Sequence, residues 1–314
     1  MPLLDHRLLF VTGKGGVGKT SVASAIGMLA AERGKRTLIC EVDAKGNLGD
    51  FLGVGPLQFE ATEVRKKLFA MSMNTEESLK EYLRLFLKVP FVSRMGTLAG
   101  AFDFIANAAP GVKEILTIGK LAYEVKENHY DLVVVDASAT GHVVGQLSSP
   151  VAINELVKVG LVRNQTDWMI ELLTDHQQTG VVVVTAPEEM PVSETLELIG
   201  RLGGETEIGL SAVVVNRVLP ELFSGDDEEI FERLRSGAPA EVLRERTGEG
   251  ITDVLDGADL AVRLRRGRVS HMTRLRENLP SGVDLLYVPY LFHRSHGVRA
   301  TGLIAEELGS ELGF

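Results

Sequence analysis

The feature that most constrains how this sequence can fold is a glycine-rich octapeptide near its N-terminus, Gly13 to Thr20, which reads GKGGVGKT. It fits the pattern G-x-x-x-x-G-K-[ST] of phosphate-binding loops. The apolar residues 7–12 precede it, and residues 21–33, rich in Ala, Ile, Leu and Met, follow it with helical spacing. A strand, a glycine loop and a helix in this order are the context that such a loop requires.

Each residue type in this loop has a physical role in binding a polyphosphate. The glycines allow backbone N–H groups to turn inward around phosphate oxygens, and the following helix adds the positive end of its dipole. The ammonium group of Lys19 then reaches the β- and γ-phosphates, and the hydroxyl of Thr20 is placed to bind Mg²⁺. The alternative is a glycine-rich turn that only joins a strand to a helix.

Composition limits the classes of partner and cofactor. The 314 residues carry a formal net charge of −10, which argues against a general nucleic-acid or anionic-membrane surface. Cys40 is the single cysteine, so one chain cannot form a disulfide framework or a Cys-x-x-Cys zinc clamp, and we expect this thiol to be buried. The N-terminal residues lack the apolar segment of a signal peptide, and we therefore expect a cytoplasmic protein.

The order of apolar segments predicts the fold class. Strands and helices alternate at both ends of the chain, and the strands are continuously apolar, which is typical of a parallel sheet covered on both faces. We expect one α/β domain over 1–314, a doubly wound, mostly parallel sheet of the P-loop NTPase type. The stretches 75–128 and 143–178 predict helices only, and hence an inserted helical subdomain. The expected strands are 7–12, 35–43, 68–73, 131–136, 181–186, 210–216 and 283–288. The expected helices include 75–89, 92–108, 112–128, 191–202, 226–235, 251–279, with Gly257 and Gly267 as weak points, and 298–312.

Three further charged residues are candidates for the chemistry of a phosphate site. Asp136 ends an apolar strand, where a P-loop enzyme places a carboxylate that holds Mg²⁺. Asp43 also follows a strand and would orient or deprotonate an attacking water, although an ordinary turn aspartate explains it equally well. Lys14 lies at the lip of the loop, where it either serves a facing subunit or is simply solvated.

These motifs resemble those of the ArsA-like ATPases. The loop matches the deviant Walker A sequence of this family and of MinD/ParA-type proteins. Residues 136–142, which read DASATGH, are similar to the second switch of the ArsA branch, usually DTAPTGH, and residues 43–50 are similar to its first switch. The Thr-Gly-His element favours the ArsA branch, because MinD/ParA proteins lack it.

The resemblance implies a dimer that binds ATP and Mg²⁺ at its interface, with Lys14 contacting phosphates across that interface. Asp43 would position water, Asn216 and the segment from Pro289 to Phe292 would hold adenine, and Glu188 would lie near the partner's nucleotide. The partner would be a second copy or a paralogous ATPase, and a hydrophobic or membrane-protein client is expected for the helical subdomain. The implied nucleotide ligands are Gly13, Lys14, Gly15, Gly16, Val17, Gly18, Lys19, Thr20, Ser21, Glu188, Asn216, Pro289, Tyr290 and Phe292, and the metal ligands are Thr20 and Asp136.

The sequence also departs from the family pattern. Ala139 replaces the proline of the second switch, and Ala44, Lys45 and Gly46 replace Pro-Ala-His in the first. These changes bear on coupling and on the rate of hydrolysis more than on nucleotide binding. Two other functions therefore stay open, a MinD/ParA-type positioning ATPase and a nucleotide-clamped assembly subunit with little turnover. The apolar residues of the insert either form its core or line a groove for a client.

Overall fold

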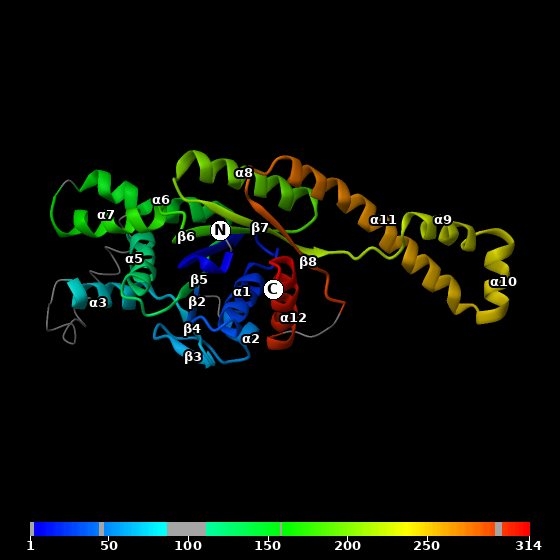
Figure 1. Ribbon diagram of the computed structural model, residues 1–314, viewed down its shortest axis with the longest axis horizontal. Helices are drawn as coiled ribbons and strands as arrows, with labels where there is room; N and C mark the ends of the chain where they lie inside the picture. The colour runs from blue at the N-terminus through cyan, green and yellow to red at the C-terminus, as the bar shows by residue number, and fades with distance from the viewer. Residues whose placement is uncertain (1–2, 44–46, 87–110, 158, 293–296) are drawn as a thin grey trace.

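The computed structural model describes residues 3–43, 47–86, 111–157, 159–292 and 297–314 (Figure 1). A central sheet of eight strands runs in the order β3-β4-β2-β5-β1-β6-β7-β8. The strands are β1 (Leu8–Gly13), β2 (Thr37–Glu41), β3 (Thr62–Arg65), β4 (Leu68–Ser72), β5 (Leu132–Asp136), β6 (Thr179–Thr185), β7 (Leu210–Val218) and β8 (Asp284–Pro289). All neighbouring pairs are parallel except β3 and β4, which are antiparallel.

The continuously apolar strands are buried because helices cover both faces of the sheet. Successive residues of β1 alternate between two cores, Leu9 and Val11 in one and Leu8 and Phe10 in the other. The first core includes residues of α1 (Lys19–Glu32), α2 (Asn47–Leu52) and α12 (Val298–Glu311). The second includes residues of α5 (Val112–Lys126), α6 (Thr140–Leu156), α7 (Leu161–Thr174), α8 (Glu189–Glu205) and α11 (Gly250–Glu277). The predicted doubly wound α/β architecture is confirmed.

A group of helices stands at one end of the sheet, where Figure 1 draws them on the left. α3 (Thr75–Phe86) and α5 lie between β4 and β5 in the chain, and α6 and α7 lie between β5 and β6. These helices lie largely within the helix-only stretches 75–128 and 143–178, and we call them the helical insert; that they form a subdomain stays a prediction. The expected helix over 92–108 lies outside the described residues. None of the helices in the described ranges is both long and apolar enough to cross a bilayer.

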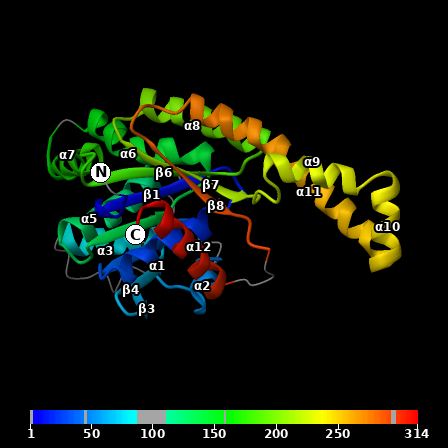
Figure 2. The ribbon, with the colours of Figure 1, turned by 45° about the vertical axis from the view of Figure 1, so that its right-hand side comes forward.

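A second helical projection leaves the opposite end of the sheet. It consists of α9 (Gly225–Leu234), α10 (Gly237–Thr247) and the first half of α11, and both views show it extending away from the sheet (Figures 1 and 2). We call residues 225–267 the arm. The second half of α11 returns to the body beside α8, where Arg274 Nη1 donates a hydrogen bond to Ser193 Oγ at 3.1 Å.

Several local expectations need correction. β2 ends at Glu41 rather than at Asp43, and β3 and α10 form where the sequence analysis placed no element. The residues of β3 are almost all exposed, so the apolar signal of a strand is missing. α11 is continuous through Gly257 and Gly267, which do not interrupt it. Cys40 is fully buried as expected, and burial raises the pKa of its thiol.

Candidate functional site

The predicted site residues gather at the carboxyl edge of the sheet. Gly13 ends β1, Asp136 ends β5, and Pro289 ends β8. Asn216 lies near the end of β7, Glu188 is the N-cap of α8 after β6, and Asp43 follows β2 by two residues. Ligands of open α/β sheets bind outside this edge, because the loops there converge from neighbouring strands. Segments that are far apart in the sequence are therefore brought to one place.

The geometry of the loop requires glycine at two positions. Gly13 has φ of +148°, and a Cβ there would lie 2.1 Å from the carbonyl oxygen of Val184 on β6. Gly18 has φ of +97°, and its Cβ would lie 2.3 Å from Asn216 Nδ2. L-residues with a side chain rarely adopt such backbone angles. The loop is consequently held close to β6 and β7, and its backbone turns over the start of α1.

The two lysines of the loop have different surroundings. Lys19, the first residue of α1, donates a hydrogen bond from Nζ to the carbonyl oxygen of Lys14 at 3.3 Å and so curls back along the loop. Lys14 extends to α8, where its Nζ lies 2.5 Å from Glu194 Oε1. Both members of this ion pair are about one-third exposed, at 29% and 32%. Nothing in the local sequence indicates Glu194, which lies 180 residues further along the chain.

Thr20 and Asp136 are in direct contact. The Thr20 hydroxyl donates a hydrogen bond to Asp136 Oδ2 at 2.7 Å, although 116 residues separate them. The pKa of Asp136 is raised to about 6, chiefly by burial and to a lesser extent by the charges of Glu41 and Asp43, against the opposing effects of the Thr20 hydrogen bond and of Lys19. A divalent cation here would favour the charged carboxylate. A hydroxyl and a carboxylate on a phosphate loop are the donor set that Mg²⁺ takes from protein in nucleotide sites.

Glu41 is a further acidic residue of the site that the sequence analysis missed. It ends β2, its exposed fraction is 3%, and its Oε1 accepts a hydrogen bond from the backbone N–H of Leu48 at 3.4 Å. Its position at a strand end, two residues before Asp43, was a usable signal. Residues 44–46, which carry the altered first switch, lie outside the described residues. In the described ranges no three acidic, histidine or cysteine side chains form a metal cluster.

The residues expected to hold the base lie on β7, at the end of β8 and just after it. Asn216 is buried, its Nδ2 donates to the carbonyl oxygen of Val17 at 2.8 Å, and its Oδ1 accepts from the N–H of Arg217 at 2.9 Å. Asn216 therefore braces the phosphate loop. The rings of Tyr290 and Phe292 lie 5.0 Å apart between centroids and are 43% and 67% exposed. An exposed aromatic pair at this edge offers a surface on which a purine could stack.

Glu188 lies on the same edge and is bound to α11. Its Oε1 is 3.5 Å from Arg268 Nη2, so the N-terminus of α8 is tied to the helix that leads into the arm. The arginines of α11 are in large part paired with acidic residues. Arg263 and Arg265 pair with Asp259 and Glu221, and Arg266 pairs with Glu228.

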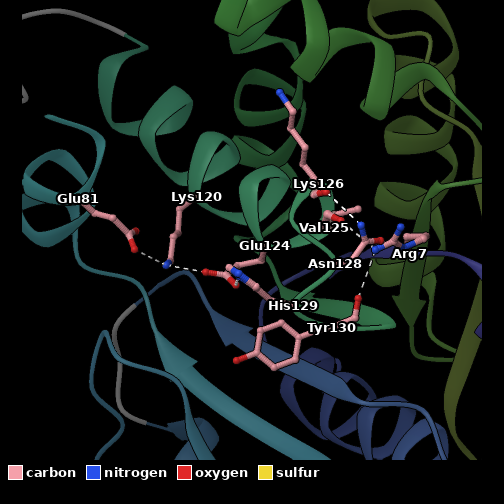
Figure 3. A network of polar contacts seen from close by, with 9 residues as sticks. All are labelled: Arg7, Glu81, Lys120, Glu124, Val125, Lys126, Asn128, His129 and Tyr130. Carbon is pink, nitrogen blue, oxygen red and sulfur yellow. Dashed lines mark hydrogen bonds and ion pairs between the residues drawn. The ribbon is translucent and has the colours of Figure 1, made fainter. Parts of the chain in front are cut away.

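The helical insert is joined internally by a buried ion-pair network (Figure 3). Lys120 Nζ on α5 lies 2.9 Å from Glu81 Oε1 on α3 and 2.6 Å from Glu124 Oε1. Burial lowers the pKa of Lys120, but its hydrogen bonds to Glu124 and Glu81 outweigh burial and raise it overall. Arg7, just before β1, donates to the carbonyl oxygen of Val125 at 2.8 Å. The network therefore fixes α3 on α5, and Arg7 fixes the end of α5 beside the sheet.

A largely apolar cavity of about 220 Å³ lies between α3, α5, α6 and α7. Its walls include Leu79, Ile115, Leu116, Ile153 and Met169. Most other apolar residues of the described insert are buried in the second core. The core interpretation therefore holds for most of the described insert, whereas a groove for a client stays a prediction for the residues around this cavity.

The parallel sheet, the glycine loop and the Thr20–Asp136 contact define a protein of the P-loop NTPase class. The sequence profile of the anion-transporting ATPases (ArsA ATPases) matches residues 6–170 and 158–240. This chain therefore belongs to the ArsA ATPase family.

Individual relatives agree with this assignment. The chain is 31% identical to a protein named ATPase BagA from Mycobacterium tuberculosis, over 91% of this chain and 86% of that protein. It is 29% identical to a putative arsenical pump-driving ATPase of Halobacterium salinarum, over 96% of this chain but only 46% of that longer protein. It is 28% identical to ATPase ASNA1 homolog 1 of Paramecium tetraurelia, over 67% of this chain and 74% of that protein.

Proposed function

We propose that this protein binds ATP with Mg²⁺, hydrolyses it as a dimer, and uses the nucleotide state to move its helical insert. The observation that carries the proposal is the hydrogen bond of 2.7 Å from Thr20 to the buried Asp136. It places a hydroxyl and a carboxylate at the start of α1, beside a loop whose geometry requires glycine. Such a loop is built to surround phosphate oxygens with backbone N–H groups.

The chain supplies the groups that phosphoryl transfer to water needs. Lys19 neutralises charge on the β- and γ-phosphates, and Thr20 and Asp136 hold the cation. Asp43, exposed after β2, orients the attacking water, and Asn216, Pro289, Tyr290 and Phe292 place the base. When bound, Mg²⁺ withdraws charge from the phosphate oxygens. Hydrolysis is then mainly a matter of positioning and electrostatic stabilisation.

The insert is connected directly to this site, which supports the coupling. α6 begins at Thr140, four residues after Asp136, and forms part of the insert. A shift of residues 136–142 on nucleotide binding therefore moves the start of α6. The Lys120 network would transmit that motion to α3 as a unit, and the apolar cavity between these helices would change shape. A hydrophobic client or partner is the class of ligand that suits such a cavity.

Replacing Asp136 with Asn tests the cation site. Asn is isosteric and still accepts the Thr20 hydrogen bond, but it lacks the charge that holds Mg²⁺. We expect Mg²⁺-dependent ATP hydrolysis to fall by at least about 100-fold in a steady-state phosphate-release assay. If wild-type protein binds ATP and releases almost no phosphate, the nucleotide-clamped subunit replaces the enzyme as the better function.

The same variant should not lose stability, which separates a functional from a structural role. In metal-free protein the folded-state pKa of about 6 exceeds the ordinary aspartate value of 3.8, so ionised Asp136 destabilises the fold. The free energy of unfolding of the wild type therefore falls as pH rises from about 4 to about 6, because Asp136 must then ionise in the folded protein. Asp136→Asn has no such group and shows no such fall. In excess chelator at pH 7.5, urea unfolding should show the variant equally stable or up to about 3 kcal/mol more stable. A large loss of stability would contradict this account of the site.

The ion pair of Lys14 with Glu194 yields a prediction about the dimer. If Lys14 serves the partner's phosphates, it must leave Glu194, and the intramolecular pair opposes the active dimer. Glu194→Gln should therefore raise the hydrolysis rate about two- to fivefold, since an ion pair that is one-third exposed contributes roughly 1 kcal/mol or less. Glu197→Gln, on the same helix and exposed, is the matched control and should leave the rate unchanged. An equal or lower rate in Glu194→Gln would contradict the trans role of Lys14.

A further inference from the structure

The strand β2 ends in a buried acidic residue to which the proposed function assigns no role. The exposed fraction of Glu41 is 3%, and its Oε2 atom is shielded from solvent. The four residues before it, 37–40, are fully buried and mostly apolar. Burying a carboxylate costs free energy that an apolar side chain at the end of this strand would not. The position of Glu41 therefore requires a functional explanation.

Glu41 and Asp136 leave neighbouring points on the same face of the sheet. β2 pairs in parallel with β5, and Glu41 is the register partner of Asp136. Ile39, two residues before Glu41, and Val134, two residues before Asp136, both belong to the first core, which includes residues of α1 and α2. Since side chains alternate along a strand, both carboxylates lie on this side of the sheet. Thr20 of α1 meets Asp136 on the same side.

The two carboxylates interact electrostatically. Neighbouring strands lie about 4.8 Å apart, and the charge of Glu41 is one of the causes that raise the pKa of Asp136. Two ionised carboxylates at one buried place repel each other. A divalent cation offsets this repulsion, and Mg²⁺ in nucleotide sites takes one or two carboxylates from the protein. The pair is therefore suited to a cation that Asp136 alone would hold less tightly.

Glu41 is also bound to the first switch, residues 43–50. Its Oε1 accepts a hydrogen bond from the backbone N–H of Leu48 at 3.4 Å, near the start of α2. Leu48 is fully buried in the first core, and the carbonyl oxygen of Glu41 accepts from the N–H of Met73 at 2.8 Å, so both ends of this link are anchored. A hydrogen bond of 3.4 Å is long, and it can shorten when the carboxylate is held in place.

We propose that Glu41 is a positioning residue that couples cation binding at Asp136 to the first switch. Once the repulsion from Asp136 is offset, the Glu41 carboxylate stays against the N–H of Leu48 and holds the start of α2. Asp43, which lies between Glu41 and Leu48 in the chain, is thereby kept near the site. This inference rests on the proposed function and deepens it, because it names the group through which the first switch responds to Mg²⁺.

Calorimetric titration with the ATP analogue AMP-PNP, in Mg²⁺ and in excess chelator, tests the charge of Glu41. Glu41→Gln keeps the size of the side chain and still accepts the Leu48 hydrogen bond, but it lacks the charge. We expect the gain in affinity that Mg²⁺ gives the wild type to shrink about 10- to 100-fold in this variant. Glu32→Gln, at the exposed end of α1, is the matched control and should equal the wild type. An equal gain in Glu41→Gln would overturn this inference alone, whereas a wild type that binds no AMP-PNP would overturn the proposed function as well.

Hydrogen exchange of the α2 amides tests the coupling. With AMP-PNP bound, we expect these amides to exchange more slowly in Mg²⁺ than in chelator in the wild type, and equally fast in both in Glu41→Gln. Glu41→Asp keeps the charge but is one methylene shorter, so it should retain most of the Mg²⁺-dependent affinity and lose the slower exchange. Both variants should unfold in chelator near the urea midpoint of the wild type. A large loss of stability in both, or the same Mg²⁺ response of α2 in Glu41→Gln as in the wild type, would overturn the positioning role.

Discussion

Replacing Lys19 with alanine should lower ATP hydrolysis by at least about 1,000-fold and weaken binding of Mg·ATP. The ammonium group of Lys19 lies against the carbonyl oxygen of Lys14 and hence within the loop. Alanine removes the positive charge that offsets the γ-phosphate as its bond breaks. Loop amides alone would still bind phosphate oxygens, so binding falls less than the rate of hydrolysis. Phosphate release under steady-state conditions and calorimetric titration with Mg·ATP measure the two effects separately.

The matched control for this variant is Lys113→Ala. Lys113 is exposed on α5, and its replacement removes the same charge from the chain. Its hydrolysis rate and its urea unfolding midpoint should equal those of the wild type. Lys19→Ala should also unfold normally, since the hydrogen bond from Lys19 Nζ to the Lys14 carbonyl oxygen is long, at 3.3 Å. Normal binding and hydrolysis by Lys19→Ala would refute the phosphate-loop interpretation.

Replacing Gly13 with alanine should lower the free energy of unfolding by at least about 3 kcal/mol. A Cβ at this position would lie 2.1 Å from the carbonyl oxygen of Val184, and φ is +148°. The obstacle is backbone of β6, so no side-chain rotation relieves it. Either β1 separates from β6 or the loop loses its shape, and nucleotide binding should fall with stability. Urea unfolding and titration with Mg·ATP measure both consequences.

Gly15→Ala is the control within the same loop. Gly15 has no positive φ, and a Cβ there would meet nothing within 4 Å. Its free energy of unfolding should stay equal or rise by up to about 1 kcal/mol, because alanine restricts the unfolded chain. If Gly13→Ala and Gly15→Ala were equally stable, the close approach of the loop to β6 would not exist in solution.

Much of the site could be predicted because the carboxyl ends of parallel strands lie at one edge of a sheet. The sequence identifies β1, the loop and α1 from one motif, and Asp136 from the end of an apolar strand. Parallel strands bring their carboxyl ends to one edge, which predicts that Thr20 and Asp136 lie close together. The structure places them in hydrogen-bonding contact. Their roles with nucleotide and cation stay predictions.

The partners that fix this site could not be predicted, because they depend on packing between distant elements. Lys14 meets Glu194 only because α8 lies beside the loop. Asn216 braces Val17 only because β7 runs two strands away from β1 in the sheet. No periodicity or spacing along the chain carries this information. Glu41 is different, because its position at the end of an apolar strand could have been used to predict that it lies at the site.

The arm shows where hydrophobic patterning fails. α10 buries only Ala240 among its residues, so it lacks the apolar stripe that predicts a helix. Gly257 and Gly267 suggested weak points in α11, yet the helix spans 28 residues without interruption. An element that packs mainly on its own neighbouring helices has an apolar pattern that reflects those helices instead of the domain core.

The most direct test of the central claim is a crystal structure of the protein with Mg²⁺ and a non-hydrolysable ATP analogue. We predict that the β- and γ-phosphates lie among the backbone N–H groups of residues 13–20, with Lys19 on the γ-phosphate. We predict Mg²⁺ beside the Thr20 hydroxyl, with Asp136 bound to it directly or through water. A structure in which this loop stays empty at saturating nucleotide, or in which the triphosphate binds elsewhere, would contradict the account.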